Sequence, residues 1–187
     1  MTSRSFNWLS GLKTIVGLML VALPAIWLAA PPAILIVQEH DTGKVLYRRG
    51  MEINESFTLD YIHSITKQPV QEVYYPKDRN TLAIKEMYYD SFGSNLPVGS
   101  EQLANESTKF SVEDGYYKIT YQNRTFDRVP LRVGQVVADH TLIFNDDTKL
   151  RFADVTEGGT YVEFYVKPFF DVLKTFPPWY SLDNSIR

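Results

Sequence analysis

The hydrophobic pattern divides the chain into two parts with different periods. Residues 14–30 form an uncharged apolar run, and with the two residues before Lys13 it approaches the ~20 residues needed to span a bilayer. From Ala33 onward, apolar and polar positions alternate in short segments, which is typical of half-buried β-strands. We therefore predict one N-terminal transmembrane helix followed by an all-β domain over residues 33–167.

Short polar turns separate the strand-like segments of the body. In the first of them, Gly43 is predicted to take the positive φ of a hairpin turn. Residues 91–109 carry Gly, Pro and Asn at irregular intervals and predict a long loop. The predicted strands cover residues 33–38, 45–48, 56–65, 70–75, 81–89, 109–112, 116–122, 125–129, 141–144, 149–155 and 161–166. Short strands joined by tight turns predict a small antiparallel sandwich or open barrel.

Residues 168–187 are predicted to form a C-terminal tail. The segment from Pro168 to Phe176 is amphipathic and aromatic, and two prolines, a tryptophan and a tyrosine follow it. Such a tail is suited to contact lipid headgroups or a partner. The alternative, which we favour, is a short helix that caps the open end of the barrel.

Charge gives the N-terminal segment an orientation. Arg4 and Lys13 are the only charged residues among the first 30, whereas the rest of the chain has a net charge of −5. The positive-inside rule predicts that residues 1–12 are cytoplasmic, that residues 13–31 form a transmembrane signal anchor, and that the acidic body lies outside.

A cleaved signal peptide is the main alternative to an anchor. Cleavage after Ala30 would place Leu28 at position −3 and Pro31 at +1, and both residues are unfavourable there. A buried helix of a soluble protein fits poorly with the basic flank and with the abrupt stop at Pro31-Pro32. We therefore expect a single-pass membrane protein whose body faces the periplasm or the cell exterior.

Composition excludes several classes of function. An acidic body without a basic run is poorly suited to bind nucleic acid. The chain has no cysteine, which excludes disulfides, a thiol nucleophile and a Cys-based zinc site. The three histidines, His40, His63 and His140, are scattered and form no HExxH or HxH motif. We therefore predict no metal site and no cofactor.

The strongest candidate for a binding function is residues 61–64, Tyr-Ile-His-Ser. His63 is predicted to face the core side of a strand, and Glu72 follows on the next strand, close enough for a hydrogen-bonded His63–Glu72 pair. The alternative is a buried structural histidine. Ser64 pairs poorly with His63, because successive side chains of a strand point to opposite faces. Ser91 ends a strand without a GxSxG elbow, so we predict no catalytic residue.

Three stretches of the chain carry a family resemblance. They are Phe57-Thr58-Leu59-Asp60-Tyr61-Ile62-His63-Ser64 with Pro69-Val70-Gln71-Glu72, then Ser91-Phe92-Gly93 with Leu96-Pro97, and finally Leu131-Arg132-Val133-Gly134. In these motifs the chain resembles the small bacterial family known as domain of unknown function 1850. The resemblance implies a bacterial envelope protein without an established activity, and the predicted anchor would place it in the inner membrane. It also implies a gene often placed beside solute-uptake systems of the TRAP type, TAXI class.

Three hypotheses for function follow. The first is a membrane-anchored accessory or interaction module, not an enzyme, that docks on a TRAP transporter or its solute-binding protein. The second is a periplasmic domain that binds a small ligand through His63, Ser64, Glu72, Ser91 and Gly93. The third is a hydrolase, which would require a cleft that joins Ser91, His63 and an acid.

Overall fold

The computed structural model describes residues 31–175, with the exception of residues 95, 136 and 137. The predicted transmembrane anchor and the residues after 175 lie outside this described part. Within it, no helix is both long enough and apolar enough to cross a membrane.

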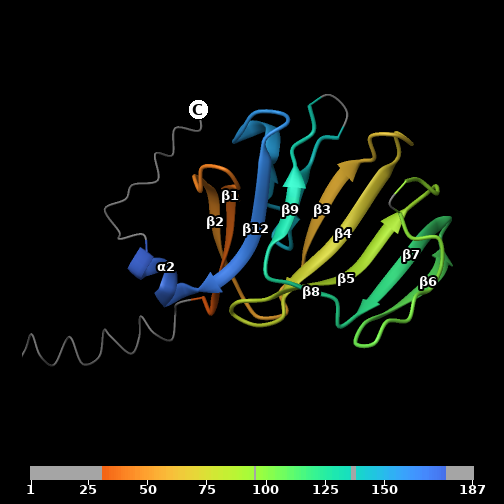
Figure 1. Cartoon of the computed structure of the whole chain (residues 1–187), viewed down its shortest axis with the longest axis horizontal. Helices are drawn as coiled ribbons and strands as arrows, with labels where there is room; N and C mark the ends of the chain where they lie inside the picture. The colour runs from red at the N-terminus through yellow and green to blue at the C-terminus, as the bar shows by residue number, and fades with distance from the viewer. Residues whose placement is uncertain (1–30, 95, 136–137, 176–187) are drawn as a thin grey trace, which may run out of the picture. The chain divides into compact units, whose positions relative to one another are not determined.

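Antiparallel β-structure dominates the described residues, which confirms the all-β prediction (Figure 1). The strands are β1 (Ala33–Glu39), β2 (Val45–Met51), β3 (Phe57–Ile62), β4 (Pro69–Pro76), β5 (Leu82–Tyr89), β6 (Ser107–Glu113), β7 (Tyr116–Gln122), β8 (Thr125–Phe126), β9 (Val129–Arg132), β10 (Thr141–Phe144), β11 (Lys149–Arg151) and β12 (Tyr161–Pro168). A 3-10 helix η1 (Phe152–Asp154) and an α-helix α2 (Phe169–Thr175) complete the described elements.

The strands form two sheets. The smaller sheet has the order β2-β1-β12-β9, and the larger has the order β11-β10-β3-β4-β5-β7-β6, with β8 paired to β5. The central pair of the smaller sheet joins chain segments more than 120 residues apart, because Ala33 is the partner of Pro168 and Glu39 is the partner of Val162. The larger sheet also contains a pair of strands that are distant in the sequence, because β3 pairs with β10.

The inner faces of the two sheets share one apolar core. Leu35 and Val37 of β1 point into this core, as expected for alternate residues of a strand. Phe57 of β3 packs edge-on against Phe164 of β12, with ring centroids 6.0 Å apart, and so connects the larger sheet to the smaller. Both rings are almost fully buried, and burial of such a side chain stabilises the fold by about 1.5–3 kcal/mol.

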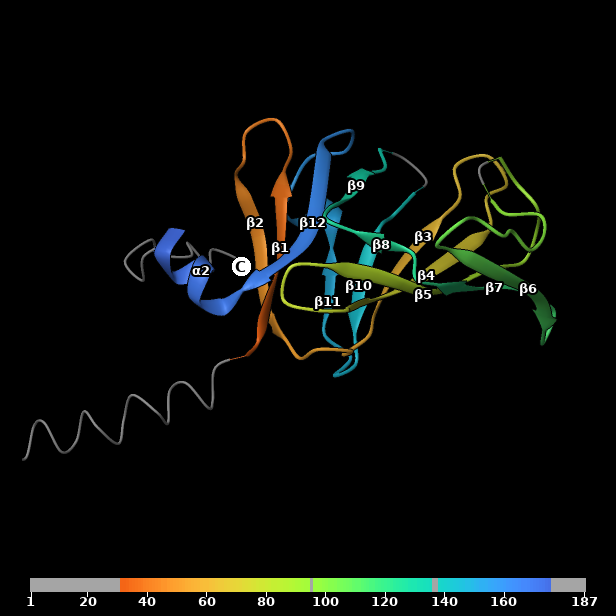
Figure 2. The same ribbon diagram turned by 60° about the horizontal axis from the view of Figure 1, so that its bottom comes forward.

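The end of the larger sheet that is formed by β7 and β6 extends beyond the smaller sheet. Strands β7 and β6 are at the opposite end of the larger sheet from β10 and β11, as Figure 2 shows. The inner face of this extension is covered by the β5–β6 loop, in which Phe92 stacks on Tyr117 at a centroid distance of 4.2 Å. Phe92 itself remains 47% exposed.

Helix α2 packs on the outer face of the smaller sheet. Val172 is buried there against Ile34, Ile36 and Tyr165. The beginning of the segment predicted as a tail is therefore a short helix, and it covers a sheet face rather than the open end of a barrel.

Three local predictions differ from the structure. The strand predicted over residues 56–65 ends at Ile62, where the chain turns. The strand predicted over residues 125–129 is divided, because β8 pairs with β5 in the larger sheet whereas β9 crosses to β12 in the smaller. The strand predicted over residues 149–155 becomes η1 after β11. Gly43 has the predicted positive φ, at 69°.

Candidate functional site

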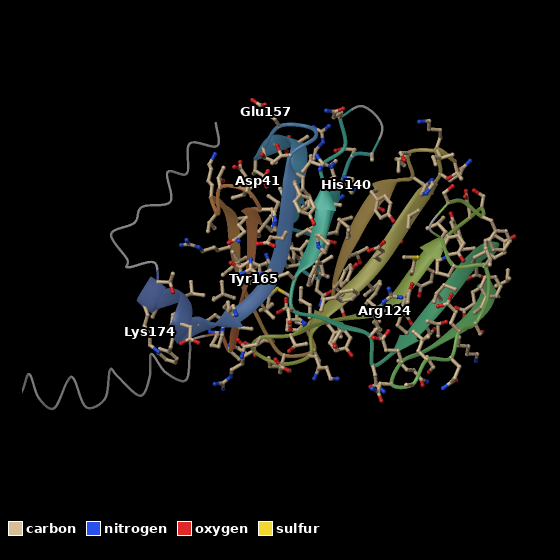
Figure 3. The ribbon with its side chains drawn as sticks, in the orientation of Figure 1. Asp41, Arg124, His140, Glu157, Tyr165 and Lys174 are labelled. Atoms are coloured by element: carbon tan, nitrogen blue, oxygen red, sulfur yellow. The ribbon has the colours of Figure 1, made fainter. Side chains whose placement is uncertain are left out.

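One cleft opens where β3 and β9 end, at the junction of the two sheets. Its volume is about 610 Å³. Residues 61–64 form the wall on the β3 side, and residues 132–135 form the wall on the β9 side. Ala138, His140 and Gly159 complete the lining. Figure 3 shows His140 in this region, near the ends of β3 and β9.

His140 is a buried histidine whose ring is fixed from two sides. Nδ1 accepts a hydrogen bond from the Gly134 N–H at 3.2 Å, and the ring packs on Tyr61 with centroids 5.2 Å apart. Because Nδ1 is the acceptor, the proton of the neutral ring is on Nε2. Burial lowers the pKa of His140, while the nearby Asp139 carboxylate opposes this shift. His140 therefore presents a neutral imidazole with an N–H donor at neutral pH.

Among the described residues that line the cleft, Arg132 is the one with a formally charged side chain. One of its terminal nitrogens donates to the Gly159 carbonyl at 2.8 Å, and the guanidinium lies 5.7 Å from the centre of the Tyr161 ring. Across the described part of the chain, no carboxylate forms an ion pair with it. The cleft therefore carries a positive charge that is not paired with any carboxylate of the described residues.

The β9 wall of the cleft depends on close approach of the backbone. A Cβ added to Gly134 would lie 1.7 Å from the Ala138 carbonyl oxygen, so only glycine fits there. The Gly134 N–H is also the donor that orients His140. Gly159 supports the same wall, since its N–H donates to the Val133 carbonyl at 2.8 Å and its φ is +89°.

His63 and Ser64 line the β3 side of the cleft, but the His63 ring nitrogens are occupied by backbone groups. Nδ1 accepts from the Thr66 N–H at 3.2 Å, and Nε2 lies 3.0 Å from the Ser94 carbonyl, to which it donates. His63 therefore ties the turn after β3 to the loop after β5. Ser64 is exposed, and its carbonyl accepts a hydrogen bond from Lys67.

The predicted His63–Glu72 pair does not form. Glu72 is the cross-strand partner of Leu59, whereas His63 lies beyond the last pair of these strands, Ile62 with Pro69. The carboxylate instead accepts hydrogen bonds from the hydroxyls of Tyr61, at 3.0 Å, and Tyr74, at 2.5 Å.

Glu72 points into the interior beside the cleft rather than into it. Its pKa is raised by burial, which the two tyrosine hydroxyls and the charge of Arg124 partly oppose. Because Tyr61 lines the cleft and donates to Glu72, the carboxylate acts as a support behind the cleft wall.

Ser91 and Gly93 are not among the residues that line the cleft. A Cβ on Gly93 would lie 2.8 Å from Thr66 Cγ2 and 3.1 Å from His63 Cε1, so the glycine lets the loop pack against the ring. The Ser91 hydroxyl is buried and has no hydrogen-bond partner among the described residues. Since both nitrogens of His63 are bonded to backbone groups, Ser91 and His63 do not form a nucleophile–base pair.

Sequence reasoning missed the β9 side of the site. Arg132 and Gly134 appeared only within a weak motif, and His140 only as a scattered histidine. These residues lie close to residues 61–64 in the cleft because β3 pairs with β10, and β10 begins directly after His140. That pairing has no local sequence signal. In the described ranges, no three His, Cys, Asp or Glu residues gather closely enough to hold a metal ion.

The fold and the cleft together define a class of small all-β domain with a cleft between its two sheets and no recognisable catalytic set among its described residues. The family model for the domain of unknown function DUF1850 matches residues 57–150. The chain therefore belongs to the DUF1850 family. The matched region contains every residue of the cleft except Gly159, whereas β1, β2 and β12 lie outside it. Comparison with curated proteins and with solved structures finds no significant match.

Proposed function

We propose that this protein is a membrane-anchored extracytoplasmic accessory module that binds a small organic anion in the cleft between its sheets. The observation that carries the proposal is the Arg132 guanidinium, which forms no ion pair with a described carboxylate, in a cleft whose described lining contains no carboxylate. A volume of about 610 Å³ is within the ~300–1,000 Å³ typical of small-molecule sites.

The donors of the cleft favour a carboxylate ligand. A guanidinium presents a planar set of N–H donors that matches a carboxylate, and the Arg132 side chain uses one terminal nitrogen on the Gly159 carbonyl. His140 adds a neutral Nε2–H, which has no hydrogen-bond partner in the described part of the chain. Arg132 would repel a cationic ligand, and the described lining offers no carboxylate to bind one, so the same geometry disfavours cations.

The accessory role rests on the sequence. The apolar run at residues 14–30 supports an anchor, and the neighbouring charges support an outward-facing body. The family resemblance implies a gene beside TRAP-type uptake systems. This expected gene position supports a TRAP transporter or its solute-binding protein as the partner. Crosslinking the protein in its native membrane and purifying it in detergent is expected to capture such a component. Repeated recovery of the protein without any transport component would refute this role.

The ligand site is tested by Arg132→Gln, which removes the charge of the cleft. We expect millimolar succinate, glutamate or benzoate to raise the Tm of the full chain in detergent, whereas their amides do not. A ligand at ten times its Kd stabilises by about 1.4 kcal/mol, which corresponds to a few degrees in Tm for a domain of this size. In Arg132→Gln this shift should be lost, as followed by intrinsic fluorescence during heating.

Arg79→Gln is the matched control for this experiment. Arg79 lies in the exposed turn between β4 and β5, away from the cleft, so its variant loses the same charge without changing the site. It should keep the full ligand-dependent shift. Equal shifts in the two variants would show that the anions act non-specifically and would overturn the proposed site.

A further inference from the structure

The outer edge of strand β9 carries backbone groups that no described residue pairs. β9 is the last strand of the smaller sheet, in which β12 is its neighbour (Figure 1). The Val133 N–H donates to the Thr160 carbonyl at 2.9 Å, and the Val133 carbonyl accepts from Gly159, so Val133 faces β12. Because successive residues of a strand direct their backbone groups to opposite edges, Pro130 and Arg132 face away from β12. Among the described residues, none accepts from the Arg132 N–H or donates to the Pro130 carbonyl.

The end strand of the larger sheet, β6, is protected where β9 is not. The Thr108 N–H donates to the Glu101 carbonyl at 2.8 Å, and the Phe110 N–H donates to the Ser100 hydroxyl at 2.9 Å. The segment before β6 thus covers part of that edge, which prevents unwanted strand pairing. The two outward-facing residues of β9 are instead exposed. Pro130 is compatible with such an edge, because its missing N–H would be needed in the interior of a sheet.

A strand that ran parallel to β9 would place one residue at both of these groups. In a parallel pair, a residue of the added strand donates its N–H to the carbonyl of one residue and accepts from the N–H two residues further on. Pro130 and Arg132 have this spacing. If the added residue is the last of its chain, one carboxylate oxygen accepts from the Arg132 N–H. The second oxygen is then left for the guanidinium of the same residue.

The same register determines where the last side chain of the added strand would lie. It would be level with Leu131 and on the same face of the sheet, since neighbouring residues of paired strands point to one side. Leu131 is partly buried and packs against the shared core. Ile62 and Val133 add apolar surface to the lining of the adjoining cleft. An apolar last residue therefore fits this position better than a charged one.

We propose that the ligand of the cleft is the C-terminal end of an extended polypeptide, which pairs in parallel with β9 and places its terminal carboxylate at Arg132. This inference rests on the anion site of the proposed function and names the chemical class of its ligand. Small carboxylates then bind as fragments of this ligand. In strand addition, main-chain hydrogen bonds supply affinity, and the terminal charge and the last side chain supply specificity.

Fluorescence polarisation with defined peptides tests the pairing in the full chain, held in nanodiscs. The probe is a fluorescein-labelled peptide of alternating valine and threonine that ends in valine with a free carboxylate. We expect it to bind at least about tenfold more tightly than its C-terminal amide, because a charged acceptor is lost from Arg132. It should also bind about fivefold or more tightly than isovalerate, measured by competition, since isovalerate lacks the peptide N–H. Arg132→Gln should remove the preference for carboxylate over amide.

Two N-methylated forms of the probe are matched controls for the main-chain contact. Methylation of the last amide removes the N–H that donates to the Pro130 carbonyl and should weaken binding by about fivefold or more. Methylation of the preceding amide removes an N–H that points away from β9 and should leave the affinity within about twofold. Equal affinities of the two methylated peptides would overturn the pairing with β9.

Failure of the inference differs from failure of the anion site. Suppose that the peptide binds no more tightly than its amide or than isovalerate, while succinate or benzoate still binds in an Arg132-dependent way. That result would overturn the polypeptide ligand and leave the anion site intact. Absence of binding by the peptides and by the small carboxylates alike would refute the anion site and this inference together.

Discussion

Replacing Gly134 with alanine is expected to lower the free energy of unfolding by about 3 kcal/mol or more and to abolish ligand binding. The new Cβ would lie 1.7 Å from the Ala138 carbonyl oxygen and 2.5 Å from its carbon. No rotamer change relieves a clash with backbone atoms, so the wall of the cleft must move. Because the Gly134 N–H also orients His140, the donor geometry of the site is lost with it. Urea unfolding followed by fluorescence measures the first effect, and the carboxylate-dependent shift in Tm measures the second.

Gly99→Ala is the control for this substitution. A Cβ at Gly99 has no atom within 4 Å, and the residue does not have a positive φ. Its alanine variant should therefore stay within about 0.5 kcal/mol of the wild type. Similar stabilities of the Gly134 and Gly99 variants would contradict the tight packing of the β9 wall.

Replacing Glu72 with alanine is expected to lower the free energy of unfolding by about 2–4 kcal/mol, because it leaves the hydroxyls of Tyr61 and Tyr74 without an acceptor. Tyr74 is almost fully buried, so water cannot easily replace the lost partner. Glu72→Gln keeps an amide oxygen as acceptor and should lose less than half as much. Chemical denaturation of the three proteins at one pH tests this order. Equal stability of the alanine variant and the wild type would contradict a structural role for the carboxylate.

The same carboxylate predicts a dependence of stability on pH. Burial raises the pKa of Glu72 above its ordinary value of 4.5, so the folded state binds its proton more tightly than the unfolded state does. The contribution of Glu72 to the free energy of unfolding should therefore fall as pH rises from 4.5 through the raised pKa. His140 acts with the opposite sign below 6.5, because burial lowers its pKa and stability rises with pH there.

Comparison with Glu72→Gln separates the two contributions. The glutamine variant lacks the titrating carboxyl but retains His140, so the difference in stability between wild type and variant should shift in favour of the variant as pH rises. A difference that stays constant from pH 4 to 7 would show that the pKa of Glu72 is the same in the folded and unfolded states.

Local chemistry accounts for the parts of the fold that could be predicted from the sequence. Gly43 and the Asp114-Gly115 turn have positive φ, and such turns mark hairpins whose strands are neighbours in the chain. The pairings of β1 with β12 and of β3 with β10 depend on which apolar faces meet in the folded core. Alternation shows that a strand has an apolar face, but it does not show the partner. The crossing from β8 to β9 between sheets was missed for this reason.

The candidate site was predicted in part for the same physical reason. His63 and Ser64 were recognised because they lie together in the sequence, and both line the cleft. The predicted pairing of His63 with Glu72 was wrong. Strand β3 ends at Ile62, so His63 lies outside the β3–β4 register on which that prediction depended. Arg132 and His140 come from a segment about 70 residues later, and only the tertiary fold brings them to the same cleft.

The central claim, that this cleft binds a small organic anion through Arg132, is tested most directly by nuclear magnetic resonance. The ¹⁵N-labelled full chain in nanodiscs is titrated with succinate, glutamate or benzoate, and the amides of Gly134 and Gly159 and the ring of His140 are followed. We predict saturable shifts at these three residues that disappear in Arg132→Gln and persist in Arg79→Gln. Unchanged signals at these residues for all three carboxylates, or equal shifts in Arg132→Gln, would contradict the claim.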